Sequence, residues 1–543
     1  MKKIYKDRKT ISVHKVAMMV TVVIMALFNQ ALWHEVVRLS VDSSTTSWLF
    51  PISLFVFLLL AINAILTLLA WPGLFKPLAV ALIIIAASAS YFMDTFGVMI
   101  DRDMIRNVLE TDVREAGDLL SIGMFVHLAL WGGIPAFLVI RQPIHYQPFF
   151  SAGKKKSVII TLSFVVMAAI VISGFKQYSV FFRNNRHVRH LIAPVNVIYA
   201  TTTLLKRMHF NAPKEFEKIG LDAKAGSILQ NSGKRSLFVM VVGETARADH
   251  FSLQGYERET NPKLKSAGGI YFSNVSSCGT ATATSLPCMF SVNSKDDFSP
   301  GEAKYREGLL DVMQRAGVRV WWLNNNSGCK GICDRVESED LSHKEIPGLC
   351  NDDGCFDKIL EKRLDKILES ETGPIFVVLH QQGSHGPAYY KRYPKEFRRF
   401  TPTCDKAQIE TCPQQDIINT YDNTLLYTDS VVADLITMLK GHSDRFDSAL
   451  LYISDHGESL GEGGIYLHGL PYSIAPSAQT HVPMYMWLSK AFSQSMQLES
   501  QCLSETKNNS YSHDNLFHTM LGIMDIKTSS YNQELDMFKH CRK

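Results

Sequence analysis

The sequence predicts a protein of two parts, an N-terminal domain of five transmembrane helices and an α/β domain with a mostly parallel central sheet. Long apolar runs are confined to residues 1–177, and that stretch contains no cysteine. All 10 cysteines lie in the more polar remainder. After residue 235, short apolar runs alternate with helical patterns, as they do in α/β folds. We therefore place a transmembrane domain at 1–177, an amphipathic connector at 178–235 and a globular domain at 236–543.

Five stretches of the N-terminal part are long and apolar enough to cross a bilayer, which takes about 20 residues. They lie near 14–33, 47–71, 77–97, 119–140 and 157–177. The first stretch follows a cluster of basic residues, Lys2, Lys3, Lys6, Arg8 and Lys9. The loop at 141–156 is also basic, and the positive-inside rule places both segments in the cytoplasm. Five crossings then leave residues 236–543 outside. A cleaved signal peptide is the competing interpretation of the first stretch, but that stretch is long and lacks a small-residue cleavage pattern.

The connector mixes aromatic and basic residues, for example at 180–183 (VFFR). This composition is typical of segments at a membrane surface. An ordinary linker helix explains the pattern equally well.

The cysteines indicate disulfides. Their even number and their confinement to the polar part are typical of a protein in an oxidising compartment. This agrees with the orientation that the basic residues predict. The spacing favours local pairs, namely Cys278–Cys288, Cys329–Cys333, Cys350–Cys355 and Cys404–Cys412, and leaves Cys502 with Cys541.

The globular part has strand-like apolar runs at 236–242, 318–323, 375–380, 448–453 and 484–488. Helical patterns lie between them, for instance at 305–315, 356–370 and 422–440. This alternation predicts a mostly parallel sheet with helices on both faces.

Two of these strands end in a carboxylate. The run 448–453 is followed by Ser454, Asp455 and His456, and the run 237–242 by Gly243 and Glu244. In an open α/β sheet, ligands bind at the carboxyl ends of the strands. Carboxylate oxygens and an imidazole nitrogen are zinc ligands, so we expect Glu244, Asp455 and His456 to hold a zinc ion.

A stretch of small hydroxylated residues, 279–285 (GTATATS), lies between Cys278 and Cys288. Ahead of a helix, such residues offer a nucleophile where phosphate oxygens are favoured. A threonine hydroxyl is a weak nucleophile until a base or metal activates it, and the expected zinc would do so with the hydroxyl as fourth ligand. The spacing does not choose among Thr280, Thr282, Thr284 and Ser285. A helix cap inside a disulfide loop is the competing interpretation.

Two further histidines are candidates for a second role. His385 follows the run 375–380 in a glycine-containing turn, and His468 follows His456 by 12 residues. Together they could bind a second metal or donate a proton to a leaving group. His380, at the strand end itself, is expected to be packed.

As a set, these motifs resemble those of the lipid A phosphoethanolamine transferases, inner-membrane enzymes of Gram-negative bacteria that are associated with polymyxin resistance. The resemblance is carried by residues 243–249 (GETARAD), 278–282 (CGTAT), 384–387 (SHGP) and 454–462 (SDHGESLGE). It covers essentially the whole chain, including the five helices, and implies an alkaline phosphatase/sulfatase-type fold for a periplasmic catalytic domain.

The resemblance also implies roles for individual residues. Thr282 is then the nucleophile, and Glu244, Asp455 and His456 hold zinc with it. His385 and His468 serve a second metal or the substrate phosphate, with Glu458 beside them. The family's substrate pocket also uses polar residues of the second outer loop and of a catalytic-domain loop, which match Asn107, Thr111, Glu115, Ser327 and Lys330. The Cys329–Cys333 pair is expected to stiffen the second of these loops.

The implied reaction moves phosphoethanolamine from phosphatidylethanolamine to a lipid A phosphate through a phosphoethanolamine–threonine intermediate. One tightly bound zinc ion is expected, with room for a second. The expected partners are the two lipids and the inner membrane, and the expected state is a monomer. Net charge is +4, from 56 basic and 52 acidic residues, so bulk charge does not identify a partner, and no nucleic acid is expected.

Four alternative interpretations compete with this one. A transferase that acts on the core sugars of lipopolysaccharide and a phosphoglycerol transferase would share the scaffold. A sulfatase would need an arginine after its nucleophile motif, which residues 285–289 (SLPCM) lack. A non-enzymatic membrane sensor would have no need of a hydroxyl nucleophile beside three metal ligands.

Overall fold

The computed structural model describes residues 10–41, 48–111, 113–209, 215–231, 235–351, 353–371 and 373–542. The basic residues at positions 2–9, which predict the orientation in the membrane, lie outside this set. The chain divides into two compact units. The first comprises residues 1–105 and 120–205, and the second residues 106–119 and 206–543. Of the predicted connector, residues 178–205 therefore cluster with the first unit and 206–235 with the second.

The first unit is helical. Its long helices are α3 (Leu49–Leu68), α4 (Phe75–Phe96), the run from Ile122 to Arg141 and α9 (Phe149–Ser173), and each is long and apolar enough to cross a membrane. The run from Ile122 to Arg141 consists of α7 (Ile122–His127), a π-helical turn (Leu128–Gly133) and α8 (Ile134–Arg141). After α9 come α10 (Phe175–Asn184) and α11 (Val195–His209). Four of the five predicted spans are thus single helical runs.

The first predicted span is broken. α1 (Val13–Leu27) and α2 (Gln30–Val41) meet at an angle of 61°. Asn29 lies at the break, and its side-chain amide donates to the carbonyls of Ile24 and Ala193 at 2.9 and 3.1 Å. Its carbonyl oxygen accepts from the Ala193 amide at 2.9 Å. The break is thus tied by hydrogen bonds to Ala193, in a distant part of the same unit, and the polar side chain at the kink has partners inside an apolar segment.

The second unit is built on a seven-stranded sheet in the order β5-β15-β12-β4-β11-β7-β8. The strands β12 (Phe446–Ser454), β4 (Arg235–Gly243), β11 (Ile375–His380), β7 (Arg319–Asn324) and β8 (Glu337–Asp340) are parallel. β15 (Met484–Leu488) is antiparallel to β12, and β5 (Ile270–Phe272) is antiparallel to β15. The prediction of a mostly parallel sheet is confirmed, with two antiparallel strands at one edge.

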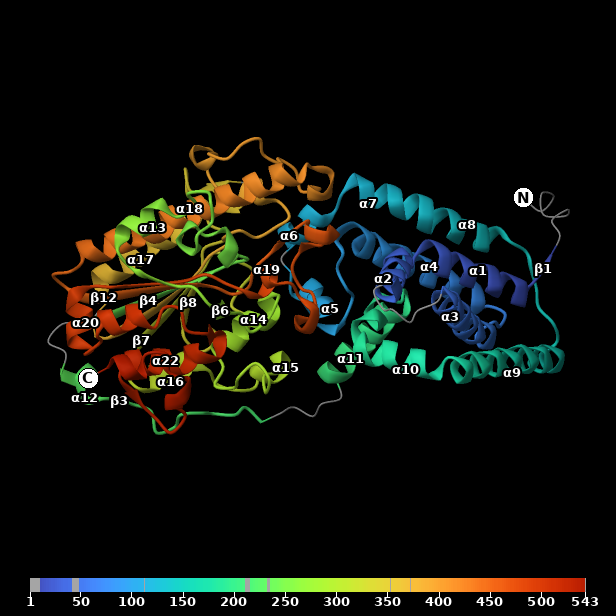
Figure 1. The fold of residues 1–543 in the computed structure, drawn as a ribbon, viewed down its shortest axis with the longest axis horizontal. Coiled ribbons are helices and arrows are strands. Elements are labelled where there is room, and N and C mark those ends of the chain that lie inside the picture. Colours follow the sequence, from blue (N-terminus) through green and yellow to red (C-terminus); the bar gives the residue numbers. More distant parts are fainter. Residues whose placement is uncertain are drawn as a thin grey trace. The chain divides into compact units, whose positions relative to one another are not determined.

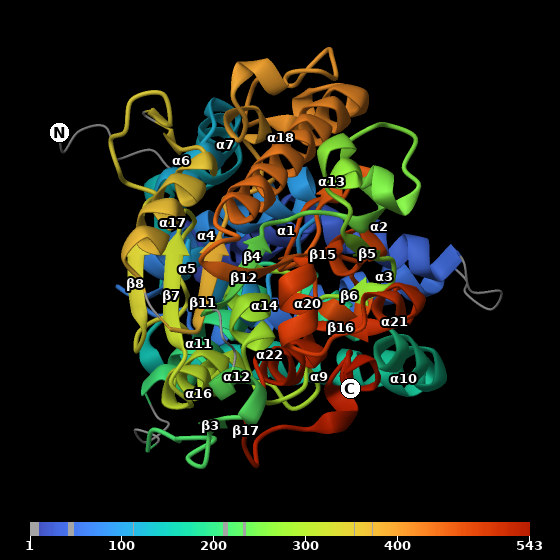
Figure 2. The ribbon, with the colours of Figure 1, turned by 90° about the vertical axis from the view of Figure 1, so that its left-hand side faces the viewer.

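Helices cover both faces of this sheet (Figures 1 and 2). On one face lie α17 (Lys358–Ser370) and α18 (Gln414–Gly441), and on the other α16 (Leu309–Arg315) and α22 (Leu516–Ile523). Alternate residues of β4 point into the two cores, Val239 toward α17 and α18 and Met240 toward α16 and α22. The predicted helix at 305–315 begins later, at Leu309, because Gly308 caps it and its amide bonds to Asp311.

Five disulfides join the cysteines of the second unit, and they are the pairs that the spacing predicts: Cys278–Cys288, Cys329–Cys333, Cys350–Cys355, Cys404–Cys412 and Cys502–Cys541. Four of them close loops of ten residues or fewer in sequence separation. They therefore stiffen individual loops, whereas the apolar layers hold the sheet and helices together.

The end of β4 leaves no room for a side chain at Gly243. A Cβ atom there would lie 2.5 Å from the Tyr452 hydroxyl and 2.8 Å from its buried ring. We predict that Gly243→Ala lowers the free energy of unfolding by about 1–3 kcal/mol, as overpacking of a core does. The measurement is the midpoint of thermal unfolding of the purified protein. Gly441→Ala is the control, because a Cβ atom at the end of α18 meets nothing within 4 Å. Equal midpoints for the two variants would contradict the prediction.

Candidate active site

The sheet register brings the two predicted carboxylates together. Ser454 of β12 pairs with Gly243 of β4, so the residues that follow, Asp455 and Glu244, leave the sheet side by side. The Asp455 amide donates to the Gly243 carbonyl at 3.0 Å. In return, the Thr245 amide donates to Asp455 Oδ1 at 3.3 Å. The carboxyl ends of two neighbouring parallel strands thus form the floor of the site, as expected for an open α/β sheet.

Glu244, Asp455 and His456 form a buried cluster. Each offers a ligand atom, and these atoms lie within 4.8 Å of one another. His456 Nε2 is 3.3 Å from Glu244 Oε1 and 3.4 Å from Asp455 Oδ2. All three side chains are almost completely shielded from solvent. The predicted ligand set is therefore assembled in the structure.

Of the four candidate hydroxyls, the structure places Thr282 at this cluster. Its Oγ1 lies 3.1 and 3.2 Å from the two carboxylate oxygens of Glu244 and 3.3 Å from His456 Nε2. Thr282 is the first residue of α14 (Thr282–Met289), where the helix dipole favours negative charge. Thr280 and Ser285 instead donate to the carbonyls of Leu470 and Asp455.

The two carboxylates of the cluster share a single imidazole. Burial, followed by the charge of Glu244, raises the pKa of Asp455 to about 7. Burial lowers the pKa of His456, but the Asp455 and Glu244 carboxylates outweigh it and raise that pKa to about 10. Burial opposes ionisation of Glu244 as well, yet the hydrogen bond and charge of His456 hold its pKa well below the usual range. Two buried carboxylates thus compete for one imidazolium.

One oxygen of the cluster lacks a hydrogen bond, although His456 Nε2 lies 3.4 Å from it. Asp455 Oδ2 is buried and accepts no hydrogen bond from the part of the chain that the structure describes. Leaving such an atom unsatisfied costs about 1–3 kcal/mol, and more when it is charged. A divalent cation would satisfy it. Two carboxylates, an imidazole and a hydroxyl would supply four oxygen and nitrogen ligands, the number that zinc usually takes. The residues present therefore fit a zinc ion.

The second predicted group lies next to the first. The His468 ring is 4.4 Å from the His456 ring, and the His385 ring is 5.5 Å from the His468 ring. Glu458 is set behind them, since its Oε1 accepts from the Tyr389 hydroxyl at 2.8 Å and its Oε2 contacts His468 Nδ1 at 2.9 Å. Both oxygens of Glu458 are engaged, so it acts on His468. His380 is packed as expected, with Nδ1 2.9 Å from Asn324 Oδ1.

The residues of the predicted substrate pocket fall in two places in the second unit. Lys330 Nζ donates to the Ser327 hydroxyl at 3.1 Å and to the Glu110 carbonyl at 3.1 Å. The Thr111 hydroxyl donates to the Asn107 carbonyl at 2.6 Å, and the side chain of Glu115 lies outside the described residues. A cavity of about 310 Å³ includes Ser327 and His385 in its wall. Lys330 therefore joins the 327–330 loop to the segment that contains Asn107 and Thr111.

Asn326 is a site residue that the sequence analysis did not single out. Its side-chain amide donates to Glu244 Oε2 at 2.7 Å and to the Gln381 carbonyl at 2.8 Å. It also lines the cavity of about 310 Å³. An asparagine in a polar loop has no distinctive pattern, and only its place after β7, in line with the ends of β4 and β12, could have drawn attention to it.

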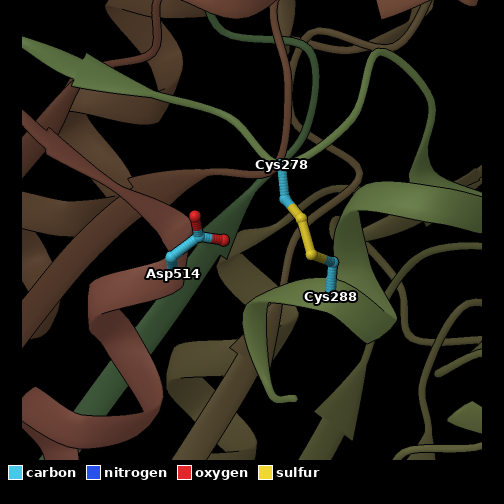
Figure 3. Close-up of side chains that lie close together, drawn as sticks. All are labelled: Cys278, Cys288 and Asp514. Carbon is cyan, nitrogen blue, oxygen red and sulfur yellow. A yellow bond between two sulfur atoms is a disulfide. The ribbon is translucent and has the colours of Figure 1, made fainter. Parts of the chain in front are cut away.

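Two other groups of close side chains contain cysteines. Cys278, Cys288 and Asp514 lie together (Figure 3), as do Cys329, Cys333 and Asp334. The sulfur atoms of each group are joined in a disulfide, so they are not thiolate ligands for a metal. Among the described residues, the Glu244, Asp455 and His456 cluster is therefore the one suited to zinc.

Comparison with known proteins agrees with this geometry. Residues 236–526 match the sulfatase family model, and residues 58–208 match the model of the phosphoethanolamine transferases EptA and EptB. The phosphoethanolamine transferase EptA of Salmonella typhimurium is 40% identical over 523 residues, which cover 96% of this chain and 95% of that protein. The chain belongs to the lipid A phosphoethanolamine transferase family. The phosphatidylethanolamine transferase Mcr-1 of Escherichia coli is 36% identical, with 88% of each chain covered.

A solved structure of the family extends over nearly the whole chain. The integral membrane lipooligosaccharide phosphoethanolamine transferase A of Neisseria meningitidis matches with a TM-score of 0.94 and 37% identity. The match covers 98% of this chain and 100% of that chain. This member of the transferase family is therefore an integral inner-membrane protein with a sulfatase-like periplasmic domain, as the resemblance of its motifs implies.

Asn326 holds a zinc-ligand candidate in place, and outer hydrogen-bond partners of this kind typically contribute 10- to 100-fold to metal affinity. We predict that Asn326→Ala lowers the affinity for Zn²⁺ by about that factor, measured by competition with a chelator. Asn325→Ala is the matched control, because Asn325 donates to Asp357 and to the Cys355 carbonyl instead. If the two variants bound Zn²⁺ equally well, Asn326 would have no part in holding Glu244.

Proposed function

We propose that this transferase moves phosphoethanolamine from phosphatidylethanolamine to a phosphate of lipid A, with Thr282 carrying the group between the two lipids at a zinc site. The single observation that carries the proposal is the position of Thr282 Oγ1, 3.1–3.3 Å from Glu244 and His456. The names of the relatives support it, since Mcr-1 is a phosphatidylethanolamine transferase. Glu244, Asp455 and His456 would hold the zinc with Thr282 as the fourth ligand.

Zinc at this site would act as a Lewis acid that lowers the pKa of the hydroxyl and offsets charge on the phosphoryl oxygens. The chain's own residues carry out the transfer. Thr282 Oγ1 attacks the phosphorus of the donor, the new O–P bond forms, and the bond from phosphorus to the diacylglycerol oxygen breaks. Glu244 accepts the Thr282 hydrogen bond and so orients Oγ1, whose proton would pass to solvent when the ion is bound. Diacylglycerol leaves once its oxygen takes up a proton.

The second step regenerates the threonine. An oxygen of the lipid A phosphate attacks the phosphorus of the phosphothreonine, and the bond from phosphorus to Thr282 Oγ1 breaks. His468 is placed for proton exchange in both steps. Its Nδ1 is engaged by Glu458, which leaves Nε2 as the nitrogen that can give a proton to, or take one from, a bound lipid. His385, beside His468, would bind the phosphate or a second metal.

The two-step route suits two lipids that must use one site in turn, because a covalent intermediate divides a difficult exchange into two easier displacements. The product carries an added ammonium group, so the lipid surface becomes less anionic. Cationic peptides such as polymyxin would then bind it less strongly. Phosphatidylethanolamine and lipid A are the expected partners of a protein that works as a monomer in the inner membrane.

Removal of the nucleophile should abolish transfer. We predict that Thr282→Ala lowers the rate by at least about 10³-fold, because loss of a catalytic nucleophile removes the covalent route. The measurement is the mass spectrum of lipid A from cells that express each variant at equal levels. Thr284→Ala, on the same helix, is the matched control and should retain activity. A wild-type lipid A pattern from Thr282→Ala would refute the nucleophile. Modification found on core sugars alone would favour the core transferase, and a lipid composition independent of Thr282 and the metal site would favour a sensor.

Removal of the Asp455 carboxylate should release the metal. We predict that Asp455→Asn lowers the zinc content of the purified protein from about one equivalent to a small fraction, since the amide removes one negative ligand. Elemental analysis after dialysis measures it. Asp447→Asn, at the other end of the same strand, is the control and should retain zinc. Unchanged zinc in Asp455→Asn would show that this cluster is not the metal site.

A further inference from the structure

A segment near the C-terminus lies directly behind the nucleophile. β16 (Tyr511–Ser512) pairs in parallel with β6 (Val275–Ser276), and β6 leads into the loop that carries Cys278. Figure 3 shows Asp514, from this C-terminal segment, next to the Cys278–Cys288 disulfide that flanks Thr282. The residue between β16 and Asp514 is His513, which is 1% exposed.

His513 is hydrogen-bonded at both ring nitrogens. Its Nδ1 accepts from the Cys278 amide at 3.1 Å, and its Nε2 donates to the Ser454 carbonyl at 3.0 Å. An amide can only donate and a carbonyl can only accept, so the proton must lie on Nε2. Burial also lowers the pKa of His513 to about 3. The ring is therefore neutral, in one tautomer, and is not a proton donor for the reaction.

Ser285 completes the contact. Its hydroxyl donates to the Asp455 carbonyl at 2.5 Å and lies 3.3 Å from His513 Nδ1. Ser285 follows Thr282 by three residues in α14, so it is on the same side of the helix, nearly one turn later. We call His513 and Ser285 the buried brace. The brace links the loop and helix that carry the nucleophile to the end of β12, which carries two of the zinc-ligand candidates.

We propose that His513 is a positioning residue for the transfer reaction, which sets the distance between Thr282 and the pair Asp455 and His456. The inference rests on the proposed function of Thr282. Nothing in the local sequence fixes that distance, because Ser285 and Asp455 are 170 residues apart in the chain. His513 bonds to the backbone on both sides of the gap, at Cys278 and at Ser454. A displacement of about 1 Å in a reacting group can cost about 10²-fold in rate.

The two bonds of His513 can be removed separately. His513→Phe removes both while retaining an aromatic ring. His513→Asn keeps an acceptor in reach of the Cys278 amide but loses the donor to Ser454, and His513→Gln keeps the donor but loses the acceptor. The matched control is His518→Phe. His518 is also buried, its pKa is lowered to about 4 by burial, and it accepts from a backbone amide, that of Asn532, away from α14.

The experiment uses purified full-length protein with phosphatidylethanolamine and lipid A in detergent. We expect His513→Phe to lower kcat by about 10²-fold with KM for the donor unchanged, and to weaken Zn²⁺ binding by about tenfold. His518→Phe should lower the unfolding midpoint but leave kcat and Zn²⁺ affinity at wild-type values. His513→Asn and His513→Gln should give rates between those of the wild type and His513→Phe, because each retains one of the two bonds.

Two results would overturn the inference. One is a kcat for His513→Phe no lower than that of His518→Phe. The other is a wild-type kcat and a wild-type Zn²⁺ affinity for both His513→Asn and His513→Gln. These two variants also test the inference if His513→Phe does not accumulate in cells. Thr282→Ala is measured in parallel. If that variant remained active, the proposed function would fail, whereas an inactive Thr282→Ala together with unaffected His513 variants would reject the brace alone.

Discussion

The structure depends on the burial of two carboxylates next to each other. Glu244 and Asp455 are shielded from water at the ends of neighbouring strands, with one imidazole between them. A buried charge is tolerated only when it is paired or bound to a cation. The positive end of α14, the Asn326 amide and His456 each supply part of that compensation. The negative charge that these groups do not offset would attract a divalent ion. That ion would in turn bind the oxygen of Thr282.

The parallel sheet makes this arrangement possible. β12 and β4 end at the same level, as does β11, whose last residue His380 pairs with Val242. Three segments that are far apart in the chain therefore deliver Glu244, Asp455 and the His385 loop to one place. Thr282, the proposed nucleophile, comes from a fourth segment outside the central strands. Its placement consequently needs contacts of its own, which the disulfide at Cys278 and the bonds of His513 provide.

Most of the fold and the centre of the site follow from the sequence. The run 375–380 coincides with β11, and the motifs at the strand ends identify Glu244, Asp455 and His456. The rest depends on contacts that a linear pattern does not contain. A short apolar run such as β15 has the same appearance in either direction, so its antiparallel pairing is not predictable. The break at Asn29 depends on Ala193, 164 residues away. Asn326 and His513 are single polar residues whose roles arise from neighbours in space.

The two outer strands of the sheet affect whether neighbouring molecules can associate through their sheet edges. A membrane protein moves in two dimensions, where neighbours meet often, and an open strand edge invites another chain to add to it. β5, at one margin, has only three residues. β8, at the other, has the sequence ESED, and Glu337 and Glu339 are paired with Arg319 and Arg363. The short length of β5 and the charged side chains of β8 both disfavour strand addition between molecules. They therefore help to prevent polymerisation in a crowded membrane.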